Sequence, residues 1–158
     1  LPTLKTWPRD GGRFITFGPT LTEDPRTRRR NYGLYRLQVF GAAETGMHWQ
    51  SMKGGRAHHW EAERMNQTLP AAVVLGGDPI LMLAAILPLP EDMDELAFAG
   101  FLRGSPVPLV HAKTINLRGP KGDNLESRPG QYSTSTWPDD PSYNRACSLS
   151  SCALDRGF

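Results

Sequence analysis

The stretch from Asn31 to Gly55, NYGLYRLQVFGAAETGMHWQSMKGG, predicts two β-strands joined by a turn. Side chains alternate along Tyr32 to Phe40, so Leu34, Arg36 and Gln38 share one face while Tyr35, Leu37 and Val39 share the other. GAAETG then forms the turn, and MHWQ begins the partner strand. A hairpin that served stability alone would carry Val, Ile and Leu here. Its many hydrogen-bonding and cationic groups therefore predict a polar ligand.

Further elements are expected on both sides of this hairpin. FITF, Phe14 to Phe17, reads as a short strand, and residues 57–67 read as a helix. Ala71 to Leu75 reads as a buried strand that ends in a Gly-Gly-Asp-Pro turn. Asp78 followed by Pro79 predicts the capped start of a helix that ends near Pro88. A second helix is expected after Pro90, with Glu91, Asp92, Asp94 and Glu95 in its first turn, and it ends at Gly104. Val107 to Leu117 is a further strand candidate.

The bulk composition excludes several classes of protein. The chain has 158 residues, 39% of them hydrophobic and 22% charged, with a formal net charge of +2. It fits one globular domain and favours neither a nucleic-acid partner nor an acidic surface. The longest apolar run, Ile80 to Leu89, contains Pro88 and falls short of the roughly 18 residues that a membrane span needs. The start, LPTLKTWPRDGG, resembles no signal peptide and lacks Met, so we expect a fragment or a processed product. Two cysteines are too few for a disulfide framework, so we expect a reducing, cytoplasmic setting.

Several groups have a plain structural interpretation. Arg26 and Arg28 to Arg30 form a basic run that we expect to be a solvated loop, with phosphate contact as the alternative. Adjacent residues on a helix point about 100° apart, so His58 and His59 cannot chelate one metal and are expected at the surface or in a second layer. We expect His111 to be a surface or cross-strand residue. Cys147 and Cys152 lack the spacing of a usual metal pair.

Five motifs in order carry a family resemblance. They are LPTLKTWPRDGGRFIT, DP with NYGLYRLQV, TGMHWQSMKGG, VVLGGDP and LPLPEDMDELAFAGFLRG. In this order they resemble the central part of the UbiD-type decarboxylases, the 3-polyprenyl-4-hydroxybenzoate carboxy-lyases and their relatives. The resemblance runs from Leu1 to about Leu117. Residues 1–117 are thus expected to be part of a prenylated-FMN-binding domain, and residues 118–158 a tail that does not match.

The resemblance implies a fold, cofactors and site residues. The fold would be α+β, a split β-barrel flavin-binding domain of the FMN-reductase-like kind with flanking helices. The cofactors would be prenylated FMN, a divalent metal (usually Mn²⁺) and a potassium ion at the phosphate. Residues that match cofactor contacts in the family are Leu34, Tyr35, Arg36, His48, Trp49, Gln50, Lys53 and Gly54. Residues that match metal ligands are Asn31, His48 and Glu95, although some members have an arginine in place of the histidine.

The chemistry of these residue types agrees with the resemblance. An amide oxygen, a carboxylate and an imidazole nitrogen suit manganese, a fairly hard ion that also accepts nitrogen. Lys53 and the backbone near Gly54 would add positive potential at a phosphate. Arg36, the predicted catalytic residue, offers the planar fork that a carboxylate needs. For Leu34 and Tyr35, core packing with only a backbone contact to the cofactor is an equal alternative.

The tail departs from the family pattern. Arg118 to Phe158 contain no Val, Ile or Met and are rich in Ser, Pro and Gly, so we expect poor order. The carboxylic acid that supplies a proton in the family lies in a downstream EGPxGDxxGYY-like segment that this chain lacks. RGPKGD, Arg118 to Asp123, comes too early to replace it. We hypothesise a reading-frame shift or a degraded gene end near residue 118. Translation of the two other frames tests this, since one of them should restore a family-like continuation.

The sequence thus favours the cofactor-binding part of a non-oxidative decarboxylase of aromatic or α,β-unsaturated carboxylic acids, of the kind used in ubiquinone biosynthesis and inactive alone. The alternatives are a non-catalytic flavin- or metal-binding module and a basic nucleic-acid-binding fragment. Implied partners are the small carboxylic acid, a flavin prenyltransferase that supplies the cofactor, and further copies of the parent protein in a homo-oligomer. Membrane contact is expected only through a lipophilic substrate, and nucleic acid is not an expected partner.

Overall fold

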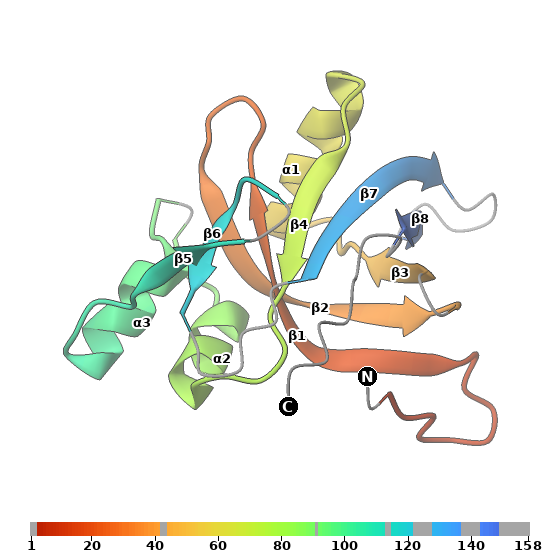
Figure 1. Ribbon diagram of the computed structural model, residues 1–158, viewed down its shortest axis with the longest axis horizontal. Coiled ribbons are helices and arrows are strands. Elements are labelled where there is room, and N and C mark those ends of the chain that lie inside the picture. The colour runs from red at the N-terminus through yellow and green to blue at the C-terminus, as the bar shows by residue number, and fades with distance from the viewer. Residues whose placement is uncertain are drawn as a thin grey trace.

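A closed antiparallel β-barrel organises the chain (Figure 1). The computed structural model describes residues 3–41, 44–90, 92–112, 115–121, 128–136 and 143–148, the last two ranges as backbone only. In this part of the chain the barrel order is β1-β2-β3-β8-β7-β4. The strands are β1 (Arg13–Glu23), β2 (Arg30–Val39), β3 (Glu44–His48), β4 (Leu69–Val73), β7 (Arg128–Thr136) and β8 (Tyr143–Ser148). The prediction of an α+β fold built on a β-barrel with flanking helices is confirmed.

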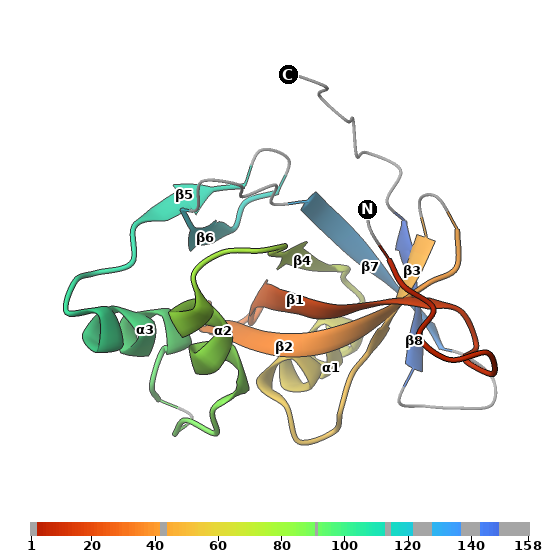
Figure 2. The ribbon, with the colours of Figure 1, turned by 90° about the horizontal axis from the view of Figure 1, so that it is seen from below.

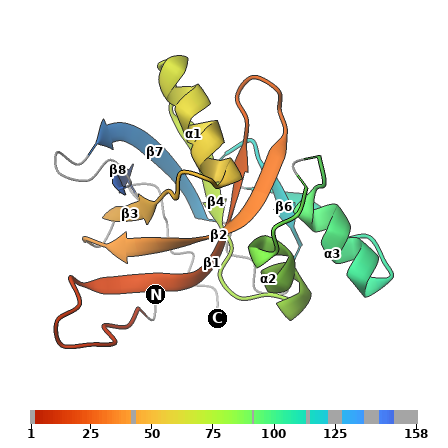
Figure 3. The ribbon, with the colours of Figure 1, turned by 180° about the vertical axis from the view of Figure 1, so that it is seen from behind.

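Two groups of elements cover the barrel. Helix α1 (Gly54–Arg64) lies along one side, where Figure 3 shows it in front of the strands. Helices α2 (Pro79–Ile86) and α3 (Glu95–Arg103) lie with the β5–β6 ribbon at one end, away from β3 and β8 (Figure 2). No helix within the described ranges is long and apolar enough to cross a membrane.

The buried side chains form two clusters that follow this division. One joins Tyr35, Leu37, Met47, Trp49, Leu69 and Ala71 of the barrel to Ala62 of α1. The other packs Leu21, Tyr32, Ala72 and Val74 against α2 and α3. Ala84 and Ala99 are fully buried in this second cluster, and such small residues let helices approach closely. The barrel thereby fixes α1 and α3, whose N-terminal ends carry predicted site residues.

Local chemistry sets the ends of α2 and α3 as the sequence predicts. The Asp78 carboxylate accepts a hydrogen bond from the N–H of Ile80 at 2.9 Å, and Pro79 occupies the first turn. Asp94 accepts from the N–H groups of Leu96 and Ala97, both at 2.9 Å. Gly104 ends α3 in the left-handed conformation with φ 68°.

Several predicted boundaries are wrong. The short strand expected at Phe14 to Phe17 is the 11-residue β1, and the strand expected at Ala71 to Leu75 is β4, Leu69–Val73. Helix α1 begins at Gly54 rather than residue 57, and β3 begins at Glu44 rather than Met47. The strand expected from Val107 to Leu117 is instead β5 (Leu109–His111), and β6 (Arg118–Pro120) pairs back onto it. The N–H of Ala112 donates to the carbonyl of Leu117 at 2.8 Å, which closes this ribbon. His111 is exposed and pairs in register with Arg118, as expected of a cross-strand residue.

Strands β6, β7 and β8 lie within residues 118–158, the tail that we expected not to match the family. Strand β7 pairs with β4, and β8 pairs with β3 and β7, so backbone from residues 128–136 and 143–148 completes the barrel. Residues 122–127, 137–142 and 149–158 of the tail, which include Cys152, lie outside the described residues. The expectation of a domain boundary at residue 117 stays a prediction.

Candidate functional site

Most of the predicted cofactor contacts line one pocket of about 270 Å³, which we call the strand pocket. Its lining residues are Thr16 from β1, Leu34, Tyr35 and Arg36 from β2, His48 from β3, and Gln50 just beyond β3. Five of them belong to the eight residues that the family motifs select. The structure therefore brings together, from two strands and the following loop, side chains that lie up to 16 positions apart in the sequence.

The alternation of β2 places its charged face on the pocket. Tyr35 and Leu37 are buried in the core, whereas Arg36 is exposed between them, as the period-two pattern predicts. The Arg36 guanidinium lies over the Phe14 ring, 5.2 Å from its centre. This cation–π contact holds the Arg36 guanidinium beside the strand pocket.

A β-bulge opposite Arg36 shapes the pocket edge. Ile15 pairs with Leu37 and Gly18 pairs with Tyr35, so Thr16 and Phe17 together face the single residue Arg36. Both bulge residues are exposed, which breaks the alternation of β1. Thr16 is a pocket residue that the sequence motifs do not indicate. Gly18 was the available signal, because a glycine within a strand often marks a bulge.

The N-terminal end of α1 is tied to the pocket through Tyr35. The Gly55 N–H donates to the Tyr35 hydroxyl at 2.8 Å, and the Lys53 ammonium lies 5.9 Å from the Tyr35 ring centre. Lys53 is the N-cap residue, and its side chain makes no capping hydrogen bond. A lysine charge and a helix N-terminus thus add positive potential at the same place.

Two of the predicted metal ligands make hydrogen bonds at the start of β2. The Asn31 amide donates to the Tyr35 hydroxyl at 3.2 Å, and its Oδ1 faces Gly54, where a Cβ would collide with it. From α3, the Glu95 carboxylate accepts the N–H of Tyr32 at 3.1 Å, next to Asn31 in the chain. Burial raises the pKa of Glu95 above its ordinary value, while the Tyr32 N–H works against that rise.

The remaining predicted cofactor residues do not line the strand pocket. Trp49 is 1% exposed and packs edge-on against Tyr35, with ring centres 4.9 Å apart. Lys53 and Gly54 lie at the start of α1, outside the lining of the strand pocket. In the described ranges, no group of three or more His, Cys, Asp or Glu side chains is placed to hold a metal. The predicted ligand set is Asn31, His48 and Glu95. Only two of these residues are of the four types just named, so the absence of such a group does not bear on this set.

Arginines of the basic run engage acidic residues. Arg26 lies 3.3 Å from Glu61, Arg28 lies 2.6 Å from Glu23, and Arg30 lies 2.5 Å from Asp94. Arg26, Arg28 and Arg29 are exposed between β1 and β2, as expected of a surface loop. Arg30 is half-buried and begins β2, so the loop interpretation is wrong for that residue. The ion pairs offer no specific support for nucleic-acid binding.

Of the two positions expected for His58 and His59, at the surface or in a second layer, the surface position is wrong. Their exposed fractions are 7% and 1%. His58 Nδ1 lies 2.9 Å from the Thr22 hydroxyl, and the His59 ring packs at 5.8 Å from the Trp49 ring. Burial lowers the pKa of both residues.

A match to a family model assigns the chain to a protein family. The model for the UbiD 3-octaprenyl-4-hydroxybenzoate carboxy-lyase Rift-related domain matches residues 1–122. The chain belongs to the UbiD family. A relative from Chlamydia pneumoniae, named as one of the subunits of 4-hydroxybenzoate decarboxylase, is 47% identical over 114 residues, which cover 72% of this chain and 19% of that protein.

Solved UbiD-class structures share the fold. Vanillic acid decarboxylase of Sedimentibacter hydroxybenzoicus, in its closed form, has 28% identity and a TM-score of 0.76, covering 84% of this chain and 29% of that one. An evolved dimeric form of the UbiD-class enzyme HmfF from Pelotomaculum thermopropionicum, in complex with prFMN, has 27% identity and a TM-score of 0.77, covering 86% and 31%. This UbiD chain spans about a quarter of the length of the curated relatives that it matches first.

Proposed function

We propose that this UbiD chain is the cofactor-binding part of a prenylated-FMN-dependent, non-oxidative decarboxylase of aromatic or α,β-unsaturated carboxylic acids. The observation that carries the proposal is the strand pocket, whose lining includes five of the eight residues selected by the family motifs. A structural relative of the chain supports the same class of cofactor, because the similar HmfF structure contains prFMN.

The residues fit a flavin with a phosphate at the α1 end. Leu34 and Tyr35 offer apolar surface, while His48 and Gln50 offer ring and amide groups that hydrogen-bond to polar ring atoms. Lys53 and the α1 N-terminus would hold the phosphate. Gly54 serves there because a side chain at this position would displace Asn31. When bound, the cofactor supplies an electron sink for the charge left as carbon dioxide departs.

Asn31, His48 and Glu95 would hold a divalent metal such as Mn²⁺ beside that phosphate, with K⁺ as a further ion. Asn31 and Glu95 supply oxygens from β2 and α3 at neighbouring places in the structure. A cation would also offset the cost of burying the Glu95 charge. His48 would add a nitrogen from β3, an arrangement that manganese accepts.

Arg36 would hold the substrate carboxylate in its planar fork at the mouth of the strand pocket. Trp49 would act by packing against Tyr35 rather than by lining the pocket. The strand pocket has no Asp or Glu among its described lining residues, so the group that supplies a proton would come from elsewhere in the parent protein. The isolated piece would then be inactive, and a flavin prenyltransferase would supply its cofactor.

The same lack of a lining carboxylate favours a second candidate, a non-catalytic module that binds flavin and metal. Release of carbon dioxide from an unsaturated acid separates the two candidates. A decarboxylase releases it when the chain is joined to the further sequence of a UbiD-class enzyme, whereas a non-catalytic module does not.

The test is to co-express the chain with a flavin prenyltransferase and to measure bound flavin by absorption and bound manganese by elemental analysis. We expect both to be present, and both to be lost in Asn31→Ala plus Glu95→Ala. A matched control is Gln67→Ala plus Glu44→Ala, which removes an exposed amide and an exposed carboxylate away from the site. A folded chain that binds neither flavin nor manganese would overturn the proposal.

A further inference from the structure

A second pocket, of about 500 Å³, adjoins the strand pocket; we call it the N-terminal pocket. Thr16 and Arg36 line both pockets, so the two meet at the bulge of β1. Its other walls include Leu4 and Trp7 from the N-terminal segment, Phe17 from β1, and Leu75 beyond β4. The volume falls within the roughly 300–1,000 Å³ range of small-molecule sites.

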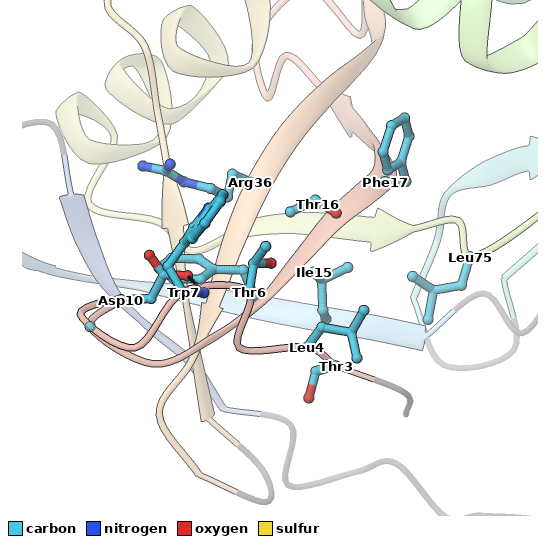
Figure 4. A pocket seen from close by; sticks show the side chains of 12 residues that line it. Thr3, Leu4, Thr6, Trp7, Asp10, Ile15, Thr16, Phe17, Arg36 and Leu75 are labelled. Atoms are coloured by element: carbon cyan, nitrogen blue, oxygen red, sulfur yellow. Dashed lines mark hydrogen bonds between the residues drawn. The ribbon is translucent and has the colours of Figure 1, made fainter.

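The N-terminal pocket has a charged end and an apolar end. Figure 4 shows Arg36, Trp7 and Asp10 together at one end, and Phe17 with Leu75 at the other. Trp7 is 69% exposed and Phe17 is 70% exposed, so two large rings face open space. Exposed apolar groups gathered around a cavity commonly mark a binding site.

Hydrogen bonds hold the N-terminal wall in place. The Trp7 N–H donates to the Asp10 carboxylate at 2.8 Å, and the Asp10 N–H returns to the Trp7 carbonyl at 3.1 Å. An isolated bridge joins Leu4 to Phe14, whose N–H donates to the Leu4 carbonyl at 3.3 Å. The Gln38 side chain donates to the Gly11 carbonyl at 3.2 Å. The turn that carries Trp7 is therefore tied to β1 and β2.

The geometry points to the N-terminal pocket as the site for the hydrocarbon part of the carboxylic acid substrate, with Trp7 and Phe17 as specificity-determining residues. The inference rests on the proposed function. A carboxylate held by Arg36 would lie where the two pockets meet, next to the flavin. The rest of a compact unsaturated or aromatic acid would then extend past Trp7 towards Phe17 and Leu75.

The probe is trans-cinnamate, and its Kd for the full chain is measured by isothermal titration calorimetry. We expect Trp7→Ala to weaken binding about tenfold, since one ring contact in a pocket is worth about that factor. Phe17→Ser is a second, independent variant with the same expected direction. Trp60→Ala is the matched control, because Trp60 is 50% exposed on α1 and lines neither pocket.

Binding of acetate and of cinnamamide shows which end of the N-terminal pocket each substitution affects. Trp7→Ala should leave the weak binding of acetate unchanged, because acetate reaches only the Arg36 end. Arg36→Gln should weaken cinnamate and leave the uncharged cinnamamide unchanged. If Trp7→Ala and Phe17→Ser bind cinnamate as Trp60→Ala does, the pocket assignment is overturned.

Flavin binding, measured on the same samples, tests the proposed cofactor function separately from the assignment of the N-terminal pocket. A chain that binds FMN but no cinnamate overturns the pocket assignment and leaves the cofactor proposal standing. A chain that binds cinnamate in a Trp7-dependent manner but no flavin supports the pocket and overturns the cofactor proposal.

Discussion

The Tyr35 hydroxyl accepts two hydrogen bonds, from the Gly55 N–H at 2.8 Å and from the Asn31 amide at 3.2 Å. One phenol thus joins strand β2 to the start of α1 and also fixes which way the Asn31 amide points. With its nitrogen turned to Tyr35, Asn31 presents Oδ1 on the Gly54 side. Tyr35 is therefore a positioning residue for the proposed metal site as well as a wall of the strand pocket.

Tyr35→Phe should lower both stability and manganese affinity while the ring stays in place. The buried Gly55 N–H would lose its acceptor, at a cost of about 1–3 kcal/mol in the free energy of unfolding. Urea denaturation measures the stability, and electron paramagnetic resonance of free Mn²⁺ measures the affinity. A variant with unchanged manganese affinity would show that the hydroxyl does not orient Asn31.

Tyr32→Phe is the matched control, on the same strand. The Tyr32 hydroxyl is buried and has no hydrogen-bond partner among the described residues. Its removal should therefore leave stability unchanged or raise it slightly, since no bond is lost and a polar group leaves the core. A large loss of stability in Tyr32→Phe would point to a partner outside the described residues.

Two adjacent glycines should respond differently to alanine. At Gly55 a Cβ would lie 2.5 Å from the Trp49 ring and 2.6 Å from the Tyr35 hydroxyl, so Gly55→Ala should destabilise by about 1–3 kcal/mol through overpacking. At Gly54 a Cβ would meet the Asn31 Oδ1 instead. Gly54→Ala should therefore reduce manganese affinity with less effect on stability. Thermal unfolding and a manganese titration distinguish them. Gly41→Ala is the control, because its Cβ would meet only the Glu44 Cβ, at an ordinary contact distance of 4.0 Å.

Local patterns predicted the features that depend only on neighbours in the chain. The alternation along β2 put Arg36 on the open face, and the Asp78–Pro79 pair gave the start of α2, because each signal spans a few residues. The family motifs added the ligand chemistry, which periodicity alone does not give.

What the sequence missed depends on contacts between distant segments. The bulge at Thr16 and Phe17 follows from the register of β1 on β2, which no single strand encodes. His58 is buried because Thr22, 36 positions away, offers its side chain a partner. Helix α1 begins at two glycines despite their poor propensity, because Tyr35 and Trp49 leave no room for a side chain at Gly55.

Asp94 should hold Glu95 in position, because it caps the helix that Glu95 begins. Its carboxylate caps the helix and also accepts two hydrogen bonds from the Arg30 guanidinium, at 2.9 and 2.5 Å. Asp94→Ala should cost about 1–2 kcal/mol from the lost cap, and should weaken manganese binding because Glu95 follows directly. Asp94→Asn keeps an oxygen for the cap but loses the charge, so denaturation should show a smaller loss. Equal losses in the two variants would assign the effect to the Arg30 ion pair.

Acid should destabilise the fold in part through His58. Burial lowers the pKa of His58 below its ordinary value of 6.5, with Arg29 acting in the same direction and Asp24 opposing it. As pH falls below about 6.5, the unfolded chain binds a proton that the folded chain resists, so the free energy of unfolding decreases. The stability contribution is fully present above pH 6.5 and is lost towards the lower, folded pKa.

The variant His58→Gln removes this titration but keeps a polar side chain near Thr22, 2.9 Å from the histidine ring in the wild type. Urea midpoints measured from pH 7.5 to pH 5.5 should fall less steeply in the variant than in the wild type. His59 titrates in the same direction, so some slope should persist in His58→Gln. Parallel midpoint curves for the two proteins would mean that His58 binds its proton equally well in the folded and unfolded chains.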